Sequence, residues 1–392
     1  MEKIIVIGAG FSGATIARLF AESGKDVIVI DKRDTVGGNA YDYTDAHNIV
    51  IQPYGPHFFH TNDKEVFEFL SQFTEWRKHE HKALARVRRD KLVTIPFNLK
   101  SLYEVYPDDK ADALKKLLID TIGLDKRVPI LQLKKHENHE IRKLADYIYK
   151  HIFSIYTMKQ WGYKPEVLGE DVMNKVPVCI TEDDRYYLDT YQFMPTEGYT
   201  ELVKNILRHP HIQLKLSTDA KKELTLKNGK IYFGGVEFDG EVIYTGCVAE
   251  LFNYKFGTLA YRSAKFKFET IKQSSYQPVP VVTYTTSNKF TRITEFTKFT
   301  CEPQPDVTVI LKEYSKPYRR NKNTPFYPIR VKKNLAQYDK YLEESKKYPN
   351  LHLLGRLANY KCINMDVAVR NAMNLFNQIN QVSSDESLAE QE

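Results

Sequence analysis

The sequence predicts an α/β protein whose nucleotide-binding domain is interrupted by two inserted regions, and three observations predict this fold class. The chain opens with an apolar run that leads into a glycine-rich turn at 3–13. A short apolar run ending on glycine returns at 241–246 and 351–355. Between these stretches apolar residues recur first with a helical period and then with a period of two, which is typical of helices followed by antiparallel strands.

The first element is a strand that begins at Lys3, followed by a G-x-G-x-x-G turn and an apolar-periodic helix. Gly8 allows the tight turn, Gly10 lets the backbone approach a pyrophosphate, and Gly13 brings the helix against the strand. A second apolar strand ends at Asp31, at the spacing where an acid binds the ribose of an adenine dinucleotide. Together these features predict a Rossmann-like domain.

A second glycine pair, Gly37 and Gly38, favours FAD over NAD as the dinucleotide. A permanently bound flavin nucleotide lies along such a domain and is expected to meet a second glycine-rich segment. Gly246 and Gly355 end the two later strands, and we expect both of them beside the cofactor.

The later elements divide the chain into parts. Apolar periodicity predicts helices over 109–120, 139–153 and 367–379, a hairpin at 227–230, and strands over 265–269, 281–285, 292–299 and 307–313. We expect a discontinuous FAD-binding domain (1–80, 200–250, 350–380), a helical domain (98–175), an antiparallel-sheet substrate domain (81–97, 176–199, 251–349) and a disordered tail (382–392).

Composition excludes several classes of protein. The 392 residues contain no run of about 18 apolar residues that could span a membrane, and the first strand leaves no room for a signal peptide. The four cysteines are scattered without C-x-x-C spacing, which fits a reducing cytoplasm. The net charge of +7 is too mild to indicate nucleic-acid binding. His136 and His139 lack metal-site spacing, so we predict no metal.

Six later motifs, in order, strongly resemble the prokaryotic UDP-galactopyranose mutases, and the resemblance runs from residue 1 to about 380. The motifs are Tyr54-Gly-Pro-His57-Phe-Phe-His60, Tyr156-Thr-Met-Lys-Gln-Trp161, Asp184-Arg-Tyr186, Thr291-Arg292, Pro325-Phe-Tyr327-Pro and Gly355-Arg356-Leu.

The resemblance implies an activity: interconversion of the pyranose and furanose forms of a nucleotide-linked sugar, for surface polysaccharide biosynthesis. It implies reduced FAD, whose N5 attacks the anomeric carbon and forms a covalent flavin–sugar adduct, with NAD(P)H or free reduced flavin as reductant. It also implies a cytoplasmic homodimer without a membrane span.

The resemblance also implies roles for individual residues. Arg292 bridges the diphosphate, His60 lies close to the flavin, and Arg262 lies near sugar and flavin. The residues implied to bind substrate are Tyr156, Tyr186 and Tyr327 at the phosphates, Trp161 at the ribose, and Ile152 and Phe153 at the base, with 162–174 as a gating loop. The residues implied to bind the cofactor are Gly8, Gly10, Gly13, Asp31, Lys32, Gly38, Asn39, His57, Gly246, Gly355, Arg356 and Met365.

Some positions implied to contact the substrate depart from the family pattern, which leaves the substrate open. Lys175 replaces an arginine of the gating loop, Cys362 a tyrosine, Asn364 an aspartate, His81 an asparagine and Glu104 a glutamine. UDP-galactopyranose, dTDP-fucopyranose and another nucleotide-linked hexose or heptose remain candidates. A flavin amine oxidase-type oxidoreductase and a non-catalytic nucleotide-sugar-binding relative are the alternatives from other functional classes.

Overall fold

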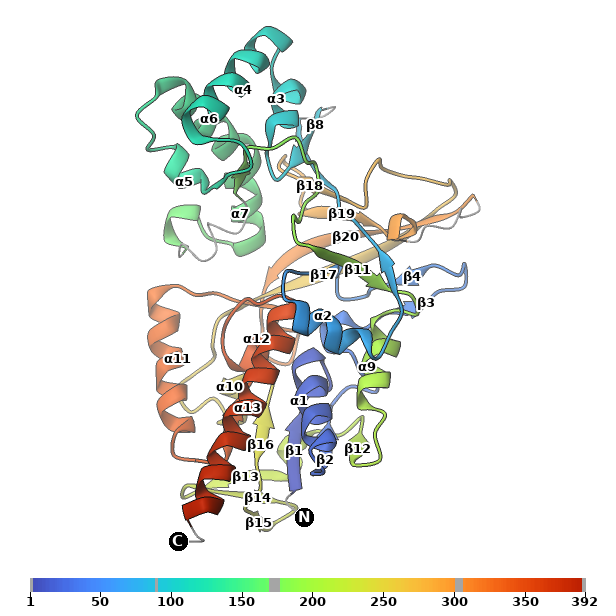
Figure 1. Ribbon diagram of the computed structural model, residues 1–392, viewed down its shortest axis with the longest axis vertical. Helices are drawn as coiled ribbons and strands as arrows, with labels where there is room; N and C mark the ends of the chain where they lie inside the picture. Colours follow the sequence, from blue (N-terminus) through green and yellow to red (C-terminus); the bar gives the residue numbers. More distant parts are fainter. Residues whose placement is uncertain (1–2, 89–90, 169–176, 300–305, 390–392) are drawn as a thin grey trace.

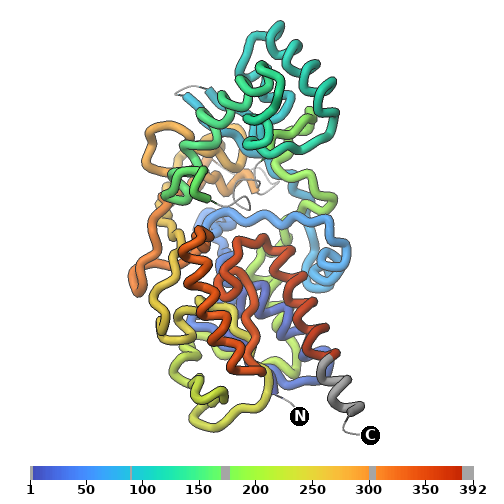
Figure 2. The backbone as a smooth tube through the Cα atoms, turned by 90° about the vertical axis from the view of Figure 1, so that its left-hand side faces the viewer, coloured from blue at the N-terminus to red at the C-terminus, as the bar shows by residue number. Residues whose placement is uncertain are grey.

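The computed structural model describes residues 3–88, 91–168, 177–299 and 306–389, with side chains up to residue 381. Three regions follow one another along the long axis: a parallel sheet with flanking helices, a larger sheet, and a group of helices (Figure 1). The chain begins and ends at the parallel-sheet end, away from that group of helices (Figure 2). No helix in the described ranges is long and apolar enough to cross a membrane.

The parallel sheet has five strands in the order β12-β2-β1-β16-β22, and every neighbouring pair is parallel. The strands are β1 Lys3–Ile7, β2 Asp26–Ile30, β12 Ile212–Lys215, β16 Val242–Tyr244 and β22 Leu351–Leu353. They come from stretches of the chain far apart in sequence. Their carboxyl ends, and the glycine turns after β1, β16 and β22, therefore meet at one edge of the sheet.

Both faces of this sheet are buried, because alternate residues of a strand point to opposite sides. Ile4 and Val6 join a core with α1, α2, α9 and α13, whereas Ile5 joins a core with α10 and α11. The helices are α1 Phe11–Glu22, α2 Lys64–Ser71, α9 Tyr199–Leu207, α10 Val248–Leu251, α11 Lys332–Ser345, α12 Gly355–Ala358 and α13 Met365–Ala389.

Two of these helices differ from the sequence prediction. The segment of α11 is predicted in the antiparallel-sheet domain, yet it buries Tyr338 and Tyr341 against the core beneath the parallel sheet. The composition predicts disorder from residue 382, but the backbone of α13 is helical to Ala389. No glycine or proline follows Met365, so no residue of the kind that ends a helix interrupts its hydrogen bonds.

The larger sheet has seven strands in the order β21-β17-β20-β19-β18-β7-β8. They are β7 Ala83–Arg88, β8 Lys91–Ile95, β17 Tyr261–Ile271, β18 Val281–Tyr284, β19 Arg292–Glu295, β20 Thr308–Pro317 and β21 Tyr327–Pro328. The prediction of a purely antiparallel sheet is wrong at one pair, because β18 runs parallel to β7. The chain leaves and re-enters the sheet between these two strands, so no hairpin fixes their direction.

The remaining described strands form four smaller sheets of two or three strands each. They are β5 Phe59–Thr61, β11 Tyr191–Pro195 and β6 Trp76–Lys78; β13 Leu224–Lys227, β14 Lys230–Phe233 and β15 Val236–Phe238; β9 Arg127–Val128 with β10 Val178–Cys179; and β3 Tyr43–Thr44 with β4 Val50–Ile51. The predicted hairpin is confirmed, since Asn228 and Gly229 have φ of 54° and 76° between β13 and β14. In contrast, we predicted 176–199 in the antiparallel-sheet domain, but β11 pairs with β5 and β6 and not with the larger sheet.

The group of helices consists of α3 Leu99–Val105, α4 Asp108–Ile122, α5 Ile130–Leu133, α6 His139–Ile148 and α7 Ser154–Trp161. The Asn138 side chain caps α6, so this polar segment starts a helix. A helix was predicted to end at Phe153, but a π-helical turn at Tyr149–Phe153 joins α6 to α7. Such turns shift the helical register and are frequent at functional sites.

Candidate functional site

A cavity of about 870 Å³ lies at the edge where the parallel strands end. Its volume is within the range of about 300–1,000 Å³ that is common for ligand sites. Every residue that we predicted to bind the cofactor lines it. They are Gly8, Gly10, Gly13, Asp31, Lys32, Gly38, Asn39, His57, Gly246, Gly355, Arg356 and Met365.

Two glycine contacts shape this cavity. A Cβ atom on Gly13 would lie 1.9 Å from the carbonyl oxygen of Gly8, so only glycine lets α1 approach β1 this closely. Gly38 has a φ of +59°, and a Cβ there would lie 3.1 Å from the Cα of Gly10. The two glycine-rich segments therefore touch through their backbones. This bare backbone wall suits a pyrophosphate, which is bound by main-chain N–H groups.

Asp31 holds the first turn against the second strand. Its Oδ2 accepts a hydrogen bond from the N–H of Ala9 at 2.8 Å, and its Oδ1 accepts one from the N–H of Arg33 at 2.8 Å. The structure thus shows a role in fixing the turn. The ribose contact predicted for Asp31 stays a prediction.

Arg33 is a cavity residue that the sequence analysis missed. Its Nη1 donates to the carbonyl of Gly38 at 2.6 Å, and its Nη2 donates to Oδ1 of Asn39 at 2.9 Å. The guanidinium also lies 4.4 Å from the ring centroid of Tyr54. Its position two residues after Asp31, in the loop facing the second glycine pair, was the available signal.

At another part of the cavity, His57 lies near two cations. Burial, together with the charges of Arg356 and Arg292, lowers the pKa of His57 to about 4, so the ring is neutral at pH 7. Arg356 donates from Nε and Nη2 to the carbonyl of Ile363 at 3.2 and 2.6 Å. Its guanidinium lies 5.3 Å from the ring centroid of Tyr327. Arg356 therefore keeps a fixed positive charge at the cavity wall.

A second group of side chains centres on Arg292 of β19. Its Nε donates to Oε2 of Glu313 on β20 at 2.7 Å, and only 3% of the Glu313 side chain is exposed. Burial disfavours the charge of Arg292, but the Glu313 carboxylate, together with Tyr156 and Tyr327, outweighs burial and raises the pKa of Arg292. The guanidinium therefore carries a permanent charge in a fixed direction.

Three predicted tyrosines lie within the electrostatic reach of Arg292. Burial raises the pKa of Tyr156, Tyr186 and Tyr327, and the positive charge of Arg292 only partly opposes it. Their hydroxyl groups are therefore protonated at neutral pH and able to donate hydrogen bonds. We call Arg292, Glu313 and these three tyrosines the Arg292 cluster.

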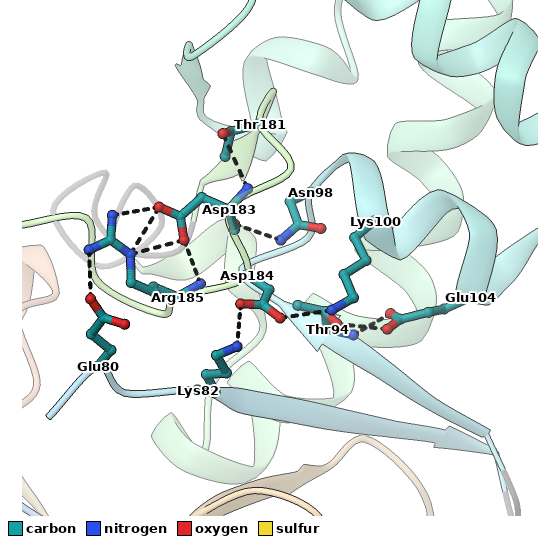
Figure 3. Close-up of polar contacts among 10 residues, drawn as sticks. All are labelled: Glu80, Lys82, Thr94, Asn98, Lys100, Glu104, Thr181, Asp183, Asp184 and Arg185. Carbon is teal, nitrogen blue, oxygen red and sulfur yellow. Dashed lines mark hydrogen bonds and ion pairs between the residues drawn. The ribbon is translucent and has the colours of Figure 1, made fainter.

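A network of ion pairs lies in the loop directly before Tyr186, and Figure 3 shows its residues. Asp184 pairs with Lys82 at 2.7 Å and Lys100 at 2.8 Å, and Asp183 pairs with Arg185 at 2.6 Å. The N–H of the next residue, Tyr186, donates to the carbonyl of His81 at 2.7 Å. The network thus ties the loop before Tyr186 to α3 and to the segment before β7.

Two departures from the family pattern lie beside this network. Glu104 of α3 accepts hydrogen bonds from the N–H and Oγ1 of Thr94 at 2.6 and 2.7 Å (Figure 3). It therefore binds α3 to the end of β8. His81 stacks on Phe58 with ring centroids 3.7 Å apart. Burial holds the pKa of His81 well below its ordinary value, helped by the charges of its neighbours. It is a neutral, buried ring.

Arg262 of β17, which the resemblance implies near sugar and flavin, makes side-chain hydrogen bonds to α7 and β20. Its Nε donates to the carbonyl of Gln160 at 2.8 Å, and its Nη2 donates to Oγ of Ser315 at 2.8 Å. The guanidinium therefore binds the carboxyl end of α7, where carbonyl groups lack helical partners. These side-chain hydrogen bonds hold α7 on β20. Through the backbone, Arg262 also lies beside the Arg292 cluster, because it is paired with Tyr327 of β21.

The remaining predicted substrate residues lie on the π-helical turn, on α7 and in the loop before α13. Ile152 and Phe153 are 8% and 9% exposed, and the ring of Trp161 lies 6.0 Å from that of Tyr327. Cys362 is half-buried, and Asn364 lines the cavity. Lys175 and the part of the predicted gating loop from residue 169 lie outside the described residues.

The comparisons with known proteins agree with this arrangement. A profile for UDP-galactopyranose mutase matches residues 151–362, and one for an NAD(P)-binding Rossmann-like domain matches 6–73. A UDP-galactopyranose mutase of Mycoplasma genitalium is 32% identical over 93% of this chain and 92% of its own length. A dTDP-fucopyranose mutase of Escherichia coli is 31% identical over 95% of this chain and 97% of its own length.

The fold is also that of a solved mutase. A crystal structure of reduced UDP-galactopyranose mutase superposes with a TM-score of 0.72, at 16% identity, over 97% of this chain and 94% of that one. The two profile matches together span both the parallel-sheet region and the Arg292 cluster. The chain therefore belongs to the UDP-galactopyranose mutase family and is an isomerase.

Proposed function

We propose that this protein interconverts the pyranose and furanose forms of UDP-galactose, dTDP-fucose or a close analogue, using FAD in its reduced form. The observation that carries the proposal is the Arg292 cluster: a fixed guanidinium and three protonated tyrosine hydroxyls near a dinucleotide cavity. Arginine and hydroxyl donors are the groups that hold a diphosphate, and this leaving group must be stabilised as its bond to the sugar breaks.

Arg292 is oriented for that task. Glu313 engages Nε, so the terminal amino groups of the guanidinium are the ones that would hold phosphate oxygens. Tyr156, Tyr186 and Tyr327 would donate to the same phosphates from α7, from the loop after Arg185 and from β21. The nucleoside diphosphate would thus stay bound while the sugar ring opens and closes.

The cavity fits FAD by its construction. The Gly10–Gly38 contact would face the pyrophosphate, and Asp31 the ribose of the adenosine. Arg356 would provide a positive charge beside the flavin ring. When bound and reduced, FAD supplies an electron-rich nitrogen that can attack the anomeric carbon. A fixed cation beside the ring would stabilise the anionic reduced form.

The nucleoside would occupy the helical side of the site. Ile152 and Phe153 would contact the base from the π-helical turn, and Trp161 would lie at the ribose. Closure of the gating loop over this region would exclude water from a reactive intermediate. Arg262 would act here indirectly, by holding the carboxyl end of α7 in place.

Two nucleotide sugars are the leading substrates, because relatives named for each have nearly the same identity to this chain. The positions that would separate them are His81, Cys362 and Asn364. If a hydroxyl or methyl group of the substrate meets an unsuitable side chain there, the binding free energy changes by about 1–3 kcal/mol. Glu104 would also hold the end of β8, since each of its oxygens accepts a hydrogen bond from Thr94.

One experiment tests the proposal. The purified protein is loaded with FAD, reduced with dithionite without oxygen, and incubated separately with UDP-galactopyranose and dTDP-fucopyranose. Chromatographic appearance of a furanose identifies the substrate, and a reaction only in the reduced state supports the flavin role. No conversion of either sugar, or of related nucleotide hexoses and heptoses, would refute the proposal. Hydrogen peroxide released with net oxidation of an amine would instead favour the oxidoreductase alternative.

The proposal extends to the cellular setting. The enzyme would work in the cytoplasm as a homodimer, with NAD(P)H or free reduced flavin as reductant. Its furanose product would be the substrate of a glycosyltransferase that builds a surface polysaccharide. Light scattering coupled to gel filtration measures the oligomeric state. Loss of furanose residues from the cell-surface glycan after gene deletion measures the biosynthetic role.

A further inference from the structure

A polar cluster around His60 lies next to the cavity and is not needed to hold the diphosphate. Nδ1 of His60 lies 2.7 Å from Oδ2 of Asp189. The other carboxylate oxygen of Asp189 accepts a hydrogen bond from Nδ2 of Asn62 at 2.7 Å. The imidazole stacks on Tyr187, with ring centroids 3.6 Å apart and planes 13° from parallel. The stack and the carboxylate together fix both the position and the rotation of the ring.

These contacts determine which ring nitrogen carries the proton. A carboxylate can only accept hydrogen bonds, so Nδ1 must be protonated to bind Asp189. The other nitrogen, Nε2, faces Nδ2 of Asn364 at 3.4 Å. An amide N–H group can only donate, so Nε2 must accept. The geometry therefore fits the Nδ1–H tautomer, with the Nε2 lone pair directed at the Asn364 amide on the cavity wall.

The charged groups around the ring are consistent with a single carboxylate partner. The hydrogen bond from His60 lowers the pKa of Asp189 despite burial, so Asp189 is ionised at neutral pH. Burial raises the pKa of Asp366, the second carboxyl group near His60. His81 also faces His60 and is neutral, and Arg127 acts on Asp189 from the far side. Only Asp189 is within hydrogen-bond distance of the ring among these groups.

We infer that Asp189 is a positioning residue, which fixes His60 in the Nδ1–H tautomer and leaves Nε2 as a hydrogen-bond acceptor at the cavity wall. A hydroxyl group of the sugar can donate to Nε2 in place of the Asn364 amide. The catalytic use of this acceptor rests on the proposed function, but the tautomer does not.

Asn364 completes the arrangement because it is an amide. An aspartate at this position would place a second carboxylate against the same imidazole, and two carboxylates favour the doubly protonated, positively charged ring. Asn364 is exposed, so exchanging it for aspartate changes the partner of Nε2 without disturbing the core.

Nitrogen NMR of the FAD-loaded protein, labelled with ¹⁵N-histidine, tests the inference. We expect the His60 signals of a protonated Nδ1 and an unprotonated Nε2 at pH 7.5, assigned by their loss in His60→Gln.

In Asp189→Asn the amide can donate to Nδ1, so we expect the opposite tautomer. In Asn364→Asp we expect protonation of His60 to move to higher pH. As a matched control, Asp26→Asn removes the partner of His211, an exposed pair at 2.9 Å, and leaves the His60 signals unchanged.

An Nε2–H tautomer in the unmodified protein, or no change of tautomer in Asp189→Asn, would overturn the inference. If Asp189→Asn does not fold, the Asn364→Asp titration decides alone, and an unchanged His60 titration refutes the inference. Turnover provides a separate readout: Asp189→Asn should lower kcat by about 10- to 100-fold with little change in KM, as expected for a misdirected proton acceptor. A protein that shows the predicted tautomer without mutase activity would contradict the proposed function alone.

Discussion

The dinucleotide cavity and the Arg292 cluster are built on opposite principles. The cavity is lined by backbone at Gly10 and Gly38, and its shape depends on the lack of a side chain at these glycines. The Arg292 cluster consists of side chains from separate elements, and its shape depends on a charge that Glu313 holds in place. An added methyl group should therefore damage the first region, whereas a lost charge should damage the second.

The largest effect is expected from Gly13→Val. The new Cβ would meet the carbonyl oxygen of Gly8 at 1.9 Å, and that oxygen belongs to a backbone that cannot move without separating α1 from β1. We expect loss of FAD binding together with a large fall in the melting temperature. Flavin absorbance after reconstitution and circular dichroism measure the two effects.

Gly24→Asn is the matched control for this comparison. Gly24 has a φ of +83°, but nothing lies within 4 Å of a Cβ built there, and asparagine tolerates a left-handed backbone. We expect normal flavin content. An equal loss of flavin in both variants would show that the Gly8–Gly13 contact is not what limits the cavity.

Next in size is Arg292→Ala, which should leave the flavin content unchanged and reduce turnover by at least about 100- to 1,000-fold, as for loss of a charge-stabilising donor. Arg292→Lys should recover only part of the activity, because lysine keeps the charge and loses the two-pronged geometry. Anaerobic turnover and flavin absorbance are measured on the same samples. Retained turnover in Arg292→Ala would mean that the diphosphate binds elsewhere.

The two regions also differ in how far the sequence predicts them. The first two glycine-rich segments, Asp31 and the strands they follow lie within forty residues, so their spacing alone indicates a shared site. Arg33 follows Asp31 by two residues but was missed, because its hydrogen bonds to Gly38 and Asn39 depend on how the loop folds back. The Arg292 cluster was reached only through the resemblance. Its partner Glu313 was not predicted, because β19 and β20 place the two side chains together and nothing in the sequence specifies that register.

Acid should destabilise the fold through two histidines, His57 at the cavity and His79 beside Phe58. Burial lowers the pKa of His57 and of His79 to about 4, from about 6.5 in an unfolded chain. Between these values the unfolded chain binds more protons, so stability is full above pH 6.5 and falls as the pH drops toward 4. Urea unfolding at several pH values measures the slope. His79→Phe, which keeps a ring beside Phe58, should make the slope shallower, and an unchanged slope would contradict the assignment.

A smaller effect is expected from Asp31→Ala. The change leaves the N–H groups of Ala9 and Arg33 without their acceptor, which costs about 1–3 kcal/mol for each group that stays buried. We expect FAD affinity to fall by about tenfold or more, with Asp31→Asn in between because its amide keeps one acceptor oxygen. Fluorescence titration of the apoprotein with FAD measures both, and full flavin retention in Asp31→Ala would contradict the role of this carboxylate.

The smallest effect should come from Asp184→Asn, at the edge of the Arg292 cluster. This carboxylate pairs with Lys82 and Lys100, whose side chains are 47% and 53% exposed, and exposed ion pairs contribute at most about 1 kcal/mol. The change should alter stability little, yet raise KM by a few fold, because the loop that carries Tyr186 loses its anchor to α3. The pairing of Lys346 with Glu343 is more exposed, at 69% and 71%, and does not involve the loop that carries Tyr186, so Glu343→Gln should leave KM unchanged. If both variants behave alike, the backbone bond from Tyr186 to His81 is enough to hold the tyrosine, and the cluster depends on buried contacts alone.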